Sequence, residues 1–141
     1  MLALRPYQQE AVQAVRSAAL QGQRRILCVL ATGAGKTVIA AHLAQQTKGR
    51  VLMVVNRDEL VKQSVQKLAL FVPPDQIGIV QGAEHGETAR YVVASIQTLA
   101  RPARLHALLT TDQTDPFRLV IVDESHLLSP LRRRDNRDLS W

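Results

Sequence analysis

The stretch that decides the fold is residues 24–37, RRILCVLATGAGKT, in which an apolar run leads into a glycine-containing loop that ends in lysine and threonine. The run from Arg24 to Leu30 is continuously apolar after its two arginines, which predicts a strand buried on both faces of a parallel sheet. The segment that begins at Lys36, KTVIAAHLAQQT, is rich in alanine and predicts a helix. A strand, a glycine loop and a helix in this order are typical of a loop that binds phosphate.

The residue types of this loop fit phosphate chemistry. Glycines permit backbone conformations in which successive N–H groups point at phosphate oxygens, and the helix start adds its positive end. Lys36 would reach the β- and γ-phosphates, and the Thr37 hydroxyl would ligate Mg²⁺. The usual pattern has a glycine where this chain has Leu30, so a plain glycine turn is the alternative. The predicted phosphate-contacting residues are Thr32, Gly33, Ala34, Gly35, Lys36 and Thr37.

The rest of the chain alternates between helix-like and strand-like segments. Helices are predicted at 6–21, 36–47, 57–71, 96–101 and 104–109, and strands at 50–55, 77–80, 91–94 and 117–122, with a polar loop at 81–88. Asn56 is predicted to cap the third helix with Glu59 as its capping-box partner, and Ser95 to cap the fourth. The alternation predicts an α/β fold of three layers, with a mainly parallel sheet flanked by helices and a ligand site at the carboxyl ends of the strands. An incomplete sheet at the C-terminal side is an open alternative.

A pair of carboxylates follows the last predicted strand, FRLVIV. Asp123 at a strand tip can hold Mg²⁺ through water, and Glu124 can orient or deprotonate an attacking water. A merely polar strand end is the alternative interpretation. The pair would supply the carboxylates for metal and water, which the glycine loop lacks. Both motifs are expected at the same edge of the sheet.

Composition sets the class of protein. A chain of 141 residues that is 46% hydrophobic and 21% charged fits one ordinary domain with a core. The net charge of +6 favours polyanionic partners, although a solvated basic surface explains it equally well. The single Cys28 is predicted to be a small buried hydrophobe, which fits a reducing compartment. With no apolar span or signal-like N-terminus, the predicted location is the cytoplasm, without a membrane partner.

Five motifs in one order carry a family resemblance. They are LRPYQQEAV (4–12), ATGAGKT (31–37), VVNRDELVKQ (54–63), ASIQTLAR (94–101) and DESH (123–126). Together they resemble the first, ATP-binding RecA-like lobe of superfamily 2 helicases, in particular the branch of type III restriction enzymes and DEAD-DEAH-like helicases. The resemblance covers residues 2 to about 128. It implies ATP and Mg²⁺ as cofactors, hydrolysis coupled to movement on DNA or RNA, catalytic roles for Lys36, Asp123 and Glu124, and metal binding by Thr37 and Asp123.

The resemblance also implies roles for residues outside the phosphate loop. Gln8 would read the adenine through its amide, and Arg5 or Tyr7 would flank the base; a solvent-facing glutamine at a helix start is the alternative. His126 resembles the residue that links the nucleotide site to the second lobe. Four residues resemble positions that touch the nucleic-acid backbone, and an ordinary cap or surface role is the alternative for each: Arg57, Ser95, Gln97 and Thr98.

The sequence ends soon after DESH, so the resemblance is to a truncated unit. Residues 1–131 are expected to form the ATP-binding lobe and residues 132–141 a basic tail, with the second lobe absent. The expected function is that of an ATP-binding lobe of a nucleic-acid-dependent ATPase that a second lobe completes. The alternative is an ATP- and nucleic-acid-binding module with negligible turnover, and a P-loop kinase is a distant third. The expected partners are nucleic acid, with DNA favoured over RNA, and a second RecA-like lobe or a larger helicase or restriction complex.

Overall fold

The computed structural model describes residues 3–28, 35–111 and 115–122. The helices in these ranges are α1 (Pro6–Leu20), α2 (Lys36–Gln46), α3 (Glu59–Leu68), α4 (Ile96–Leu99) and α5 (Pro102–Thr110), with a short 3-10 turn η1 (Pro74–Gln76). The strands are β1 (Arg50–Val55), β2 (Ile77–Gln81), β3 (Glu84–His85), β4 (Tyr91–Ser95) and β5 (Phe117–Val122). The predicted alternation of helices and strands from residue 36 onward is therefore confirmed.

The described strands form one sheet in the order β3-β2-β4-β1-β5. The pairs β2–β4, β4–β1 and β1–β5 are parallel, and only β3 runs antiparallel to its neighbour β2. The predicted mainly parallel α/β sheet is thus confirmed. The prediction of a plain loop at 81–88 was wrong at Gln81, which ends β2, and at Glu84 and His85, where the chain turns back and pairs with the end of β2.

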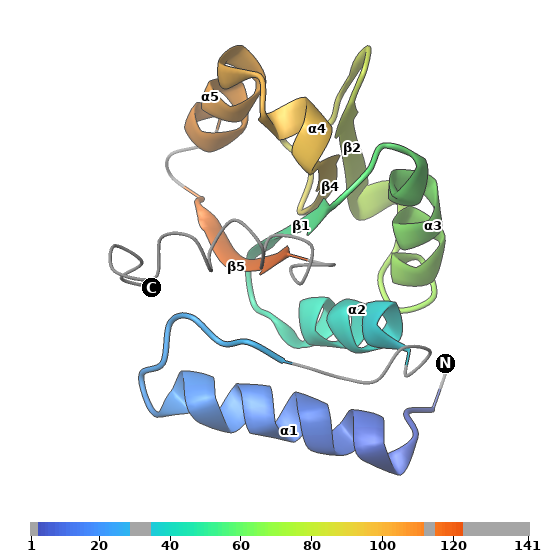
Figure 1. Ribbon diagram of the computed structural model, residues 1–141, viewed down its shortest axis with the longest axis vertical. Helices are drawn as coiled ribbons and strands as arrows, with labels where there is room; N and C mark the ends of the chain where they lie inside the picture. The colour runs from blue at the N-terminus through green and yellow to red at the C-terminus, as the bar shows by residue number, and fades with distance from the viewer. Residues whose placement is uncertain (1–2, 29–34, 112–114, 123–141) are drawn as a thin grey trace, which may run out of the picture.

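Helices cover both faces of the sheet (Figure 1). One core lies between the sheet and α2 and α3, and it includes Val51, Met53 and Val55 of β1. The alternate residues Leu52 and Val54 face the second core, to which α4 and α5 contribute. Because successive side chains of a strand point to opposite faces, β1 is buried along its whole length and is the central strand of the fold. Helix α1 lies alongside α2, farther from the sheet (Figure 1).

A buried arginine closes the amino edge of the sheet, where the parallel strands begin. Arg50 is the first residue of β1 and is 4% exposed. Its guanidinium donates hydrogen bonds to the carbonyl oxygens of Ala89 (3.2 Å) and Asp115 (3.2 Å) and to that of Glu87. The guanidinium carbon also lies 4.2 Å from the centre of the Phe117 ring. Arg50 therefore connects the segments that lead into β4 and β5 to the start of β1.

The prediction of a buried strand at 24–30 was wrong for the part that the structure describes. Residues 23–28 have no regular secondary structure, and Ile26 and Leu27 are 40% and 70% exposed. Cys28 is exposed as well, in contrast to its predicted burial. A continuous apolar run indicates that a segment can be buried, but a strand also needs a neighbour for its N–H and C=O groups. Residues 24–28 pair with none of the described strands, and residues 29–30 lie outside the described ranges.

The third helix begins later than its sequence suggests. The expected cap Asn56 lies in a bend before the helix, and α3 starts at Glu59 with Asp58 as the flanking residue and no side-chain cap. The carboxylate of Asp58 instead contacts a neighbouring strand, as described below. By contrast, the predicted cap of α4 is confirmed, since the Ser95 hydroxyl accepts a hydrogen bond from the Thr98 N–H at 3.0 Å.

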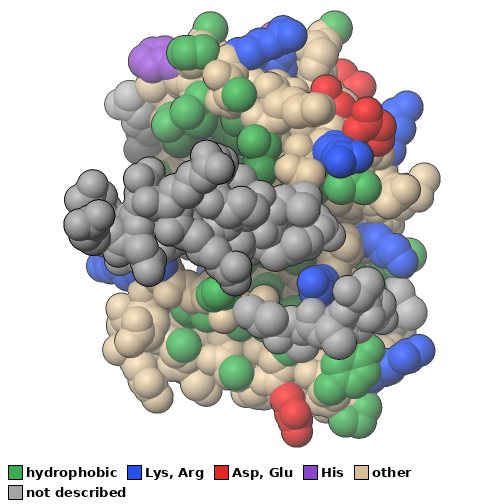
Figure 2. All heavy atoms as spheres, in the orientation of Figure 1, with side chains coloured by type: hydrophobic (Ala, Val, Ile, Leu, Met, Phe, Trp, Pro, Cys, Tyr) green, Lys and Arg blue, Asp and Glu red, His purple; other side chains and the backbone are tan. Residues whose placement is uncertain are grey.

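Two surface properties bear on partners. On the face in Figure 2, Lys and Arg side chains are scattered around the molecule and do not gather into one patch. On this face, therefore, the basic side chains do not mark a site by themselves. Among the described residues, no helix has the length and apolar character needed to cross a membrane.

Candidate functional site

The described part of the predicted phosphate loop has the conformation that its glycine permits. Gly35 is left-handed, with φ +73°, and α2 begins at the next residue. The Gly35 carbonyl accepts hydrogen bonds from the N–H groups of Val38 (3.1 Å) and Ile39 (3.2 Å), which starts the helix. The first turn of α2 thus directs the positive end of its dipole toward the loop. The other predicted loop residues Thr32, Gly33 and Ala34 lie outside the described residues.

Lys36 and Thr37 are positioned to meet a ligand at this helix start. Both are partly exposed. Within the described residues, neither the Lys36 ammonium nor the Thr37 hydroxyl is engaged in a hydrogen bond or ion pair. Their polar atoms are therefore available to an anion and to a cation that accompanies it, and the Thr37 hydroxyl fits the oxygen ligands that Mg²⁺ prefers.

Gln8 packs against the phosphate loop, although 27 positions separate it from Gly35 in the sequence. Its side chain is 6% exposed, so the alternative of a solvent-facing glutamine is wrong. A Cβ added to Gly35 would lie 2.4 Å from the Gln8 Nε2 atom, so any other residue would displace this amide and would also have to adopt a left-handed backbone conformation. The Gln8 Oε1 atom accepts a hydrogen bond from the Arg5 N–H at 2.9 Å, which holds the amide in place. The Arg5 and Tyr7 side chains are exposed at the same helix start.

The acidic motif follows the described end of β5. This strand ends at Val122, and the predicted Asp123, Glu124 and His126 lie outside the described residues. β5 runs parallel to β1 and next to it, and Val54 is paired with Val122. The end of β5 is therefore level with the end of β1, at the carboxyl edge of the sheet.

The four predicted nucleic-acid contacts gather at the carboxyl edge, but they differ in exposure. Arg57 and Gln97 are exposed, whereas Ser95 is 0% and Thr98 7% exposed. The Ser95 hydroxyl donates to the carboxylate of Asp58, and the Thr98 hydroxyl lies 3.4 Å from the same oxygen. The structure thus separates an outward pair, Arg57 and Gln97, from a buried pair whose hydroxyls serve internal hydrogen bonds.

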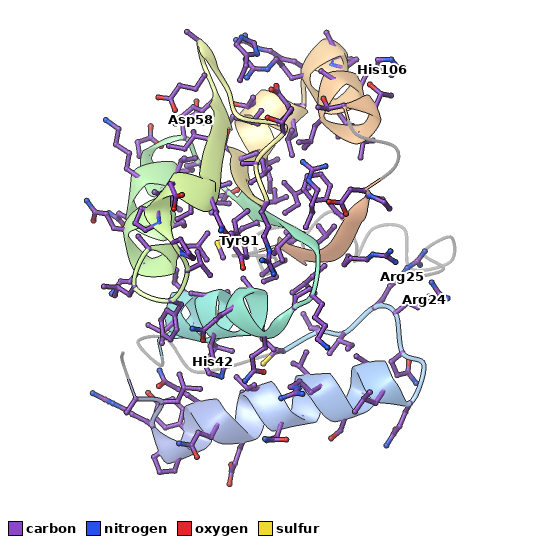
Figure 3. All side chains as sticks on the ribbon, turned by 180° about the vertical axis from the view of Figure 1, so that it is seen from behind. Arg24, Arg25, His42, Asp58, Tyr91 and His106 are labelled. Atoms are coloured by element: carbon purple, nitrogen blue, oxygen red, sulfur yellow. The ribbon has the colours of Figure 1, made fainter. Side chains whose placement is uncertain are left out.

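Two residues of this edge, Asp58 and Gln81, were not predicted from the sequence as part of the site. The Asp58 N–H donates to the Gln97 Oε1 atom at 3.1 Å, and the Asp58 carbonyl accepts from the Gln81 Nε2 atom at 2.9 Å. Figure 3 shows Asp58 beside the start of α3, far from Arg24 and Arg25. In the sequence Asp58 resembles an ordinary acid before a helix, and Gln81 an ordinary polar residue after a strand. Gln81 ends β2 and Asp58 lies three positions after β1, so their closeness to predicted strand ends was the signal that could have identified them.

Comparisons with known proteins agree on one family. The profile of a family described as "Type III restriction enzyme, res subunit" matches residues 1–133. The putative ATP-dependent helicase IRC3 of Saccharomyces cerevisiae is 36% identical over 135 residues, which cover 87% of this chain and 19% of that protein. The putative mitochondrial ATP-dependent helicase irc3 of Schizosaccharomyces pombe is 34% identical over 137 residues, which cover 92% of this chain and 22% of that protein.

A solved structure shares the fold. The UvsW helicase from bacteriophage T4 superposes with a TM-score of 0.64 and 24% identity, covering 89% of this chain and 44% of that one. At this identity the likeness concerns the fold alone. The chain spans about a fifth of the length of the two fungal helicases that it resembles.

Proposed function

Since this chain belongs to the family of the type III restriction enzyme res subunit, among the superfamily 2 helicases, we propose that it is the ATP-binding lobe of a nucleic-acid-dependent ATPase. Residues 1–131 form this lobe in the proposal, and residues 132–141 a basic tail. One observation carries the proposal: the Gln8 amide packs against Gly35, directly before Lys36. An amide that can pair with the edge of adenine therefore lies beside a helix start that can bind phosphate.

The proposed binding mode assigns one task to each group. The triphosphate lies at the start of α2, where the helix N–H groups and the Lys36 ammonium neutralise its charge. The Gln8 amide selects adenine, with Arg5 or Tyr7 beside the base. Thr37 and Asp123 would hold Mg²⁺, which when bound neutralises phosphate charge, and Glu124 would accept a proton from the attacking water.

Turnover by this chain alone is expected to be slow. In this proposal Lys36 and the metal stabilise the charge that develops on the γ-phosphate, and a second lobe would add arginines that stabilise it further. Such an arginine accelerates phosphoryl transfer by roughly 10³ to 10⁵ in related enzymes. A second lobe, or a larger helicase or restriction complex, is therefore the proposed protein partner, with His126 as the link to it.

Nucleic acid is the proposed second ligand, with DNA favoured over RNA. Arg57 and Gln97 offer exposed donors at the carboxyl edge, and contacts of this kind with the backbone do not depend on base sequence. Few contacts from one lobe predict weak binding that falls steeply with salt. Cytoplasmic location remains part of the proposal.

The test is calorimetric titration of ATP with Mg²⁺ into the purified chain and into Lys36→Ala. We expect the substitution to weaken binding by about 10- to 100-fold, because a charged hydrogen bond contributes roughly 1.5–3 kcal/mol. Lys48→Ala, which removes an exposed lysine after the other end of α2, is the matched control and should bind as the wild type does. Equal affinities for the wild type and Lys36→Ala would disprove the assignment of the phosphate loop.

Two further measurements complete this test. Gln8→Ala should narrow the preference for ATP over GTP, and an unchanged preference would remove Gln8 from the site. Phosphate release should stay slow with single-stranded DNA or RNA and rise when a second-lobe protein is added, with the rise abolished in Glu124→Gln. Fast turnover by a verified monomer would contradict the need for a second lobe.

A further inference from the structure

Asp58 joins the ends of three strands at the carboxyl edge of the sheet. It follows β1 by three positions. Its carbonyl accepts a hydrogen bond from Gln81, the last residue of β2, and its carboxylate accepts one from Ser95, the last residue of β4. Its N–H donates to Gln97 in α4. The carboxylate, carbonyl and N–H of one residue thus connect segments that are 23 to 39 positions away in the sequence.

These hydrogen bonds determine which polar groups of the edge stay available. The Ser95 hydroxyl is fully buried and bound to Asp58, so it cannot reach a nucleic-acid phosphate. The Gln97 Oε1 atom accepts the Asp58 N–H at 3.1 Å, and among the described residues nothing accepts from its two amide N–H donors, which can therefore serve an external acceptor. Arg57 immediately precedes Asp58 and is exposed, and its backbone position is fixed by the same hydrogen bonds.

We propose that Asp58 is a positioning residue that holds Arg57 and Gln97 in the arrangement that contacts the nucleic-acid backbone. The inference rests on the proposed function, since it concerns the same nucleic-acid site. The negative charge of Asp58 makes the inference testable. A carboxylate repels phosphate, so its removal should tighten binding if only long-range electrostatics acts. If the carboxylate holds the two donors in place, its removal should weaken binding.

The experiment compares four proteins by fluorescence anisotropy with a labelled single-stranded DNA of about 20 nucleotides, a length that exceeds the footprint of one small binding domain, over a series of salt concentrations. They are the wild type, Asp58→Ala, Asp58→Asn and Asp75→Ala. Asp75 is an exposed aspartate before the start of β2, so its removal takes away the same charge far from the network. Asp58→Asn keeps an oxygen that can accept from Ser95 but removes the charge.

We expect Asp58→Ala to bind about 3- to 10-fold more weakly than the wild type, with a salt slope smaller by about 0.7 for each phosphate that the variant no longer neutralises. Asp58→Asn and Asp75→Ala should bind at least as tightly as the wild type. This opposite response of two neutralising substitutions at one position separates geometry from charge. Circular dichroism and the unfolding midpoint confirm that each variant is folded.

Three outcomes would overturn the inference. If Asp58→Ala binds as well as Asp75→Ala, or if Asp58→Asn is as weak as Asp58→Ala, the positioning role is wrong while the proposed function stands. If the wild type does not bind DNA or RNA at low salt, the proposed nucleic-acid site fails, and the role of Asp58 fails with it. Should Asp58→Ala not fold, Ser95→Ala breaks the same hydrogen bond from the other side, and unchanged binding in that variant is equally decisive.

Discussion

Arg50 and Asp58 lie at opposite ends of the central strand, and each connects segments that belong to three strands. Arg50 begins β1 and joins the segments that lead into β4 and β5. Asp58 follows the end of β1 and joins the ends of β2 and β4. The fold therefore has one charged residue of each sign at its two edges, Arg50 acting through its side chain and Asp58 through both its carboxylate and its backbone.

The two residues differ in what surrounds them. Arg50 is 4% exposed, and each of its three guanidinium nitrogens donates a hydrogen bond to a carbonyl oxygen, so this side chain joins segments of the backbone. Asp58 is only partly buried, and exposed donors of Arg57 and Gln97 lie next to it. The amino edge is thus joined by a buried side chain, whereas the carboxyl edge is joined by a partly buried residue that has exposed donors beside it.

The largest effect on stability is expected at the closed edge. Arg50→Met keeps much of the apolar stem but removes the donor of three hydrogen bonds to backbone carbonyl oxygens, so it should lower the free energy of unfolding by about 3–5 kcal/mol. Chemical denaturation followed by circular dichroism measures this decrease. Arg50→Lys keeps the charge but can replace only part of the hydrogen bonds. Its free energy of unfolding should therefore lie between those of the wild type and Arg50→Met. A decrease below about 1 kcal/mol in Arg50→Met is the contribution of a single ordinary hydrogen bond. Such a result would show that the two edges do not differ in their contribution to stability.

An intermediate effect is expected at Gly35. Gly35→Ala places a Cβ in a left-handed conformation, which costs about 1–2 kcal/mol, and it displaces the Gln8 amide. Gly22→Ala is the matched control, because Gly22 has φ +94° but nothing within 4 Å of an added Cβ. Both variants should be destabilised to a similar degree in denaturant titrations, and only Gly35→Ala should bind ATP more weakly in calorimetry. Equal ATP affinities in the two variants would show that the packing of Gln8 on Gly35 has no role in binding.

The smallest effect on stability is expected at Arg57. This side chain is exposed, so Arg57→Ala should change the free energy of unfolding by less than about 0.5 kcal/mol. It should nevertheless reduce the salt slope of DNA binding by about 0.7, the value expected for one neutralised phosphate on a single strand. Arg24→Ala removes an exposed arginine that lies far from Asp58 (Figure 3) and should leave the slope unchanged. Identical slopes in the two variants would remove Arg57 from the site.

Patterns along the chain predicted the strands that consist mainly of apolar residues and the cap whose partner lies three positions away. The mainly apolar segments at 50–55 and 117–122 became β1 and β5 at those residues, and the local cap at Ser95 formed as predicted. The prediction of a strand was wrong at 24–28 because an apolar pattern does not specify a pairing partner. Asn56 failed as a cap because the chain bends before α3, and the next acid, Asp58, contacts β4 instead.

The candidate site was predictable as a set of residue types but not as a network. The order of glycine, lysine and threonine predicted the start of α2, and the position of Arg57 after a strand placed it at the carboxyl edge. The burial of Ser95 and Thr98 depends on Asp58, which is 37 or more positions away in the sequence. The amino edge likewise depends on Arg50 and a carbonyl 65 positions away. Contacts at such separations follow from the fold and leave no local pattern.

The choice of acceptors around Arg50 has a practical consequence. Backbone carbonyl oxygens do not titrate and bear no net charge, so the hydrogen bonds of Arg50 do not depend on a carboxylate partner that acid could neutralise or that salt could screen. Conditions that change the ionic atmosphere should therefore leave the frame of the sheet intact. The salt dependence of nucleic-acid binding by this chain therefore reports on the exposed donors of the opposite edge, because salt changes the hydrogen bonds of Arg50 little.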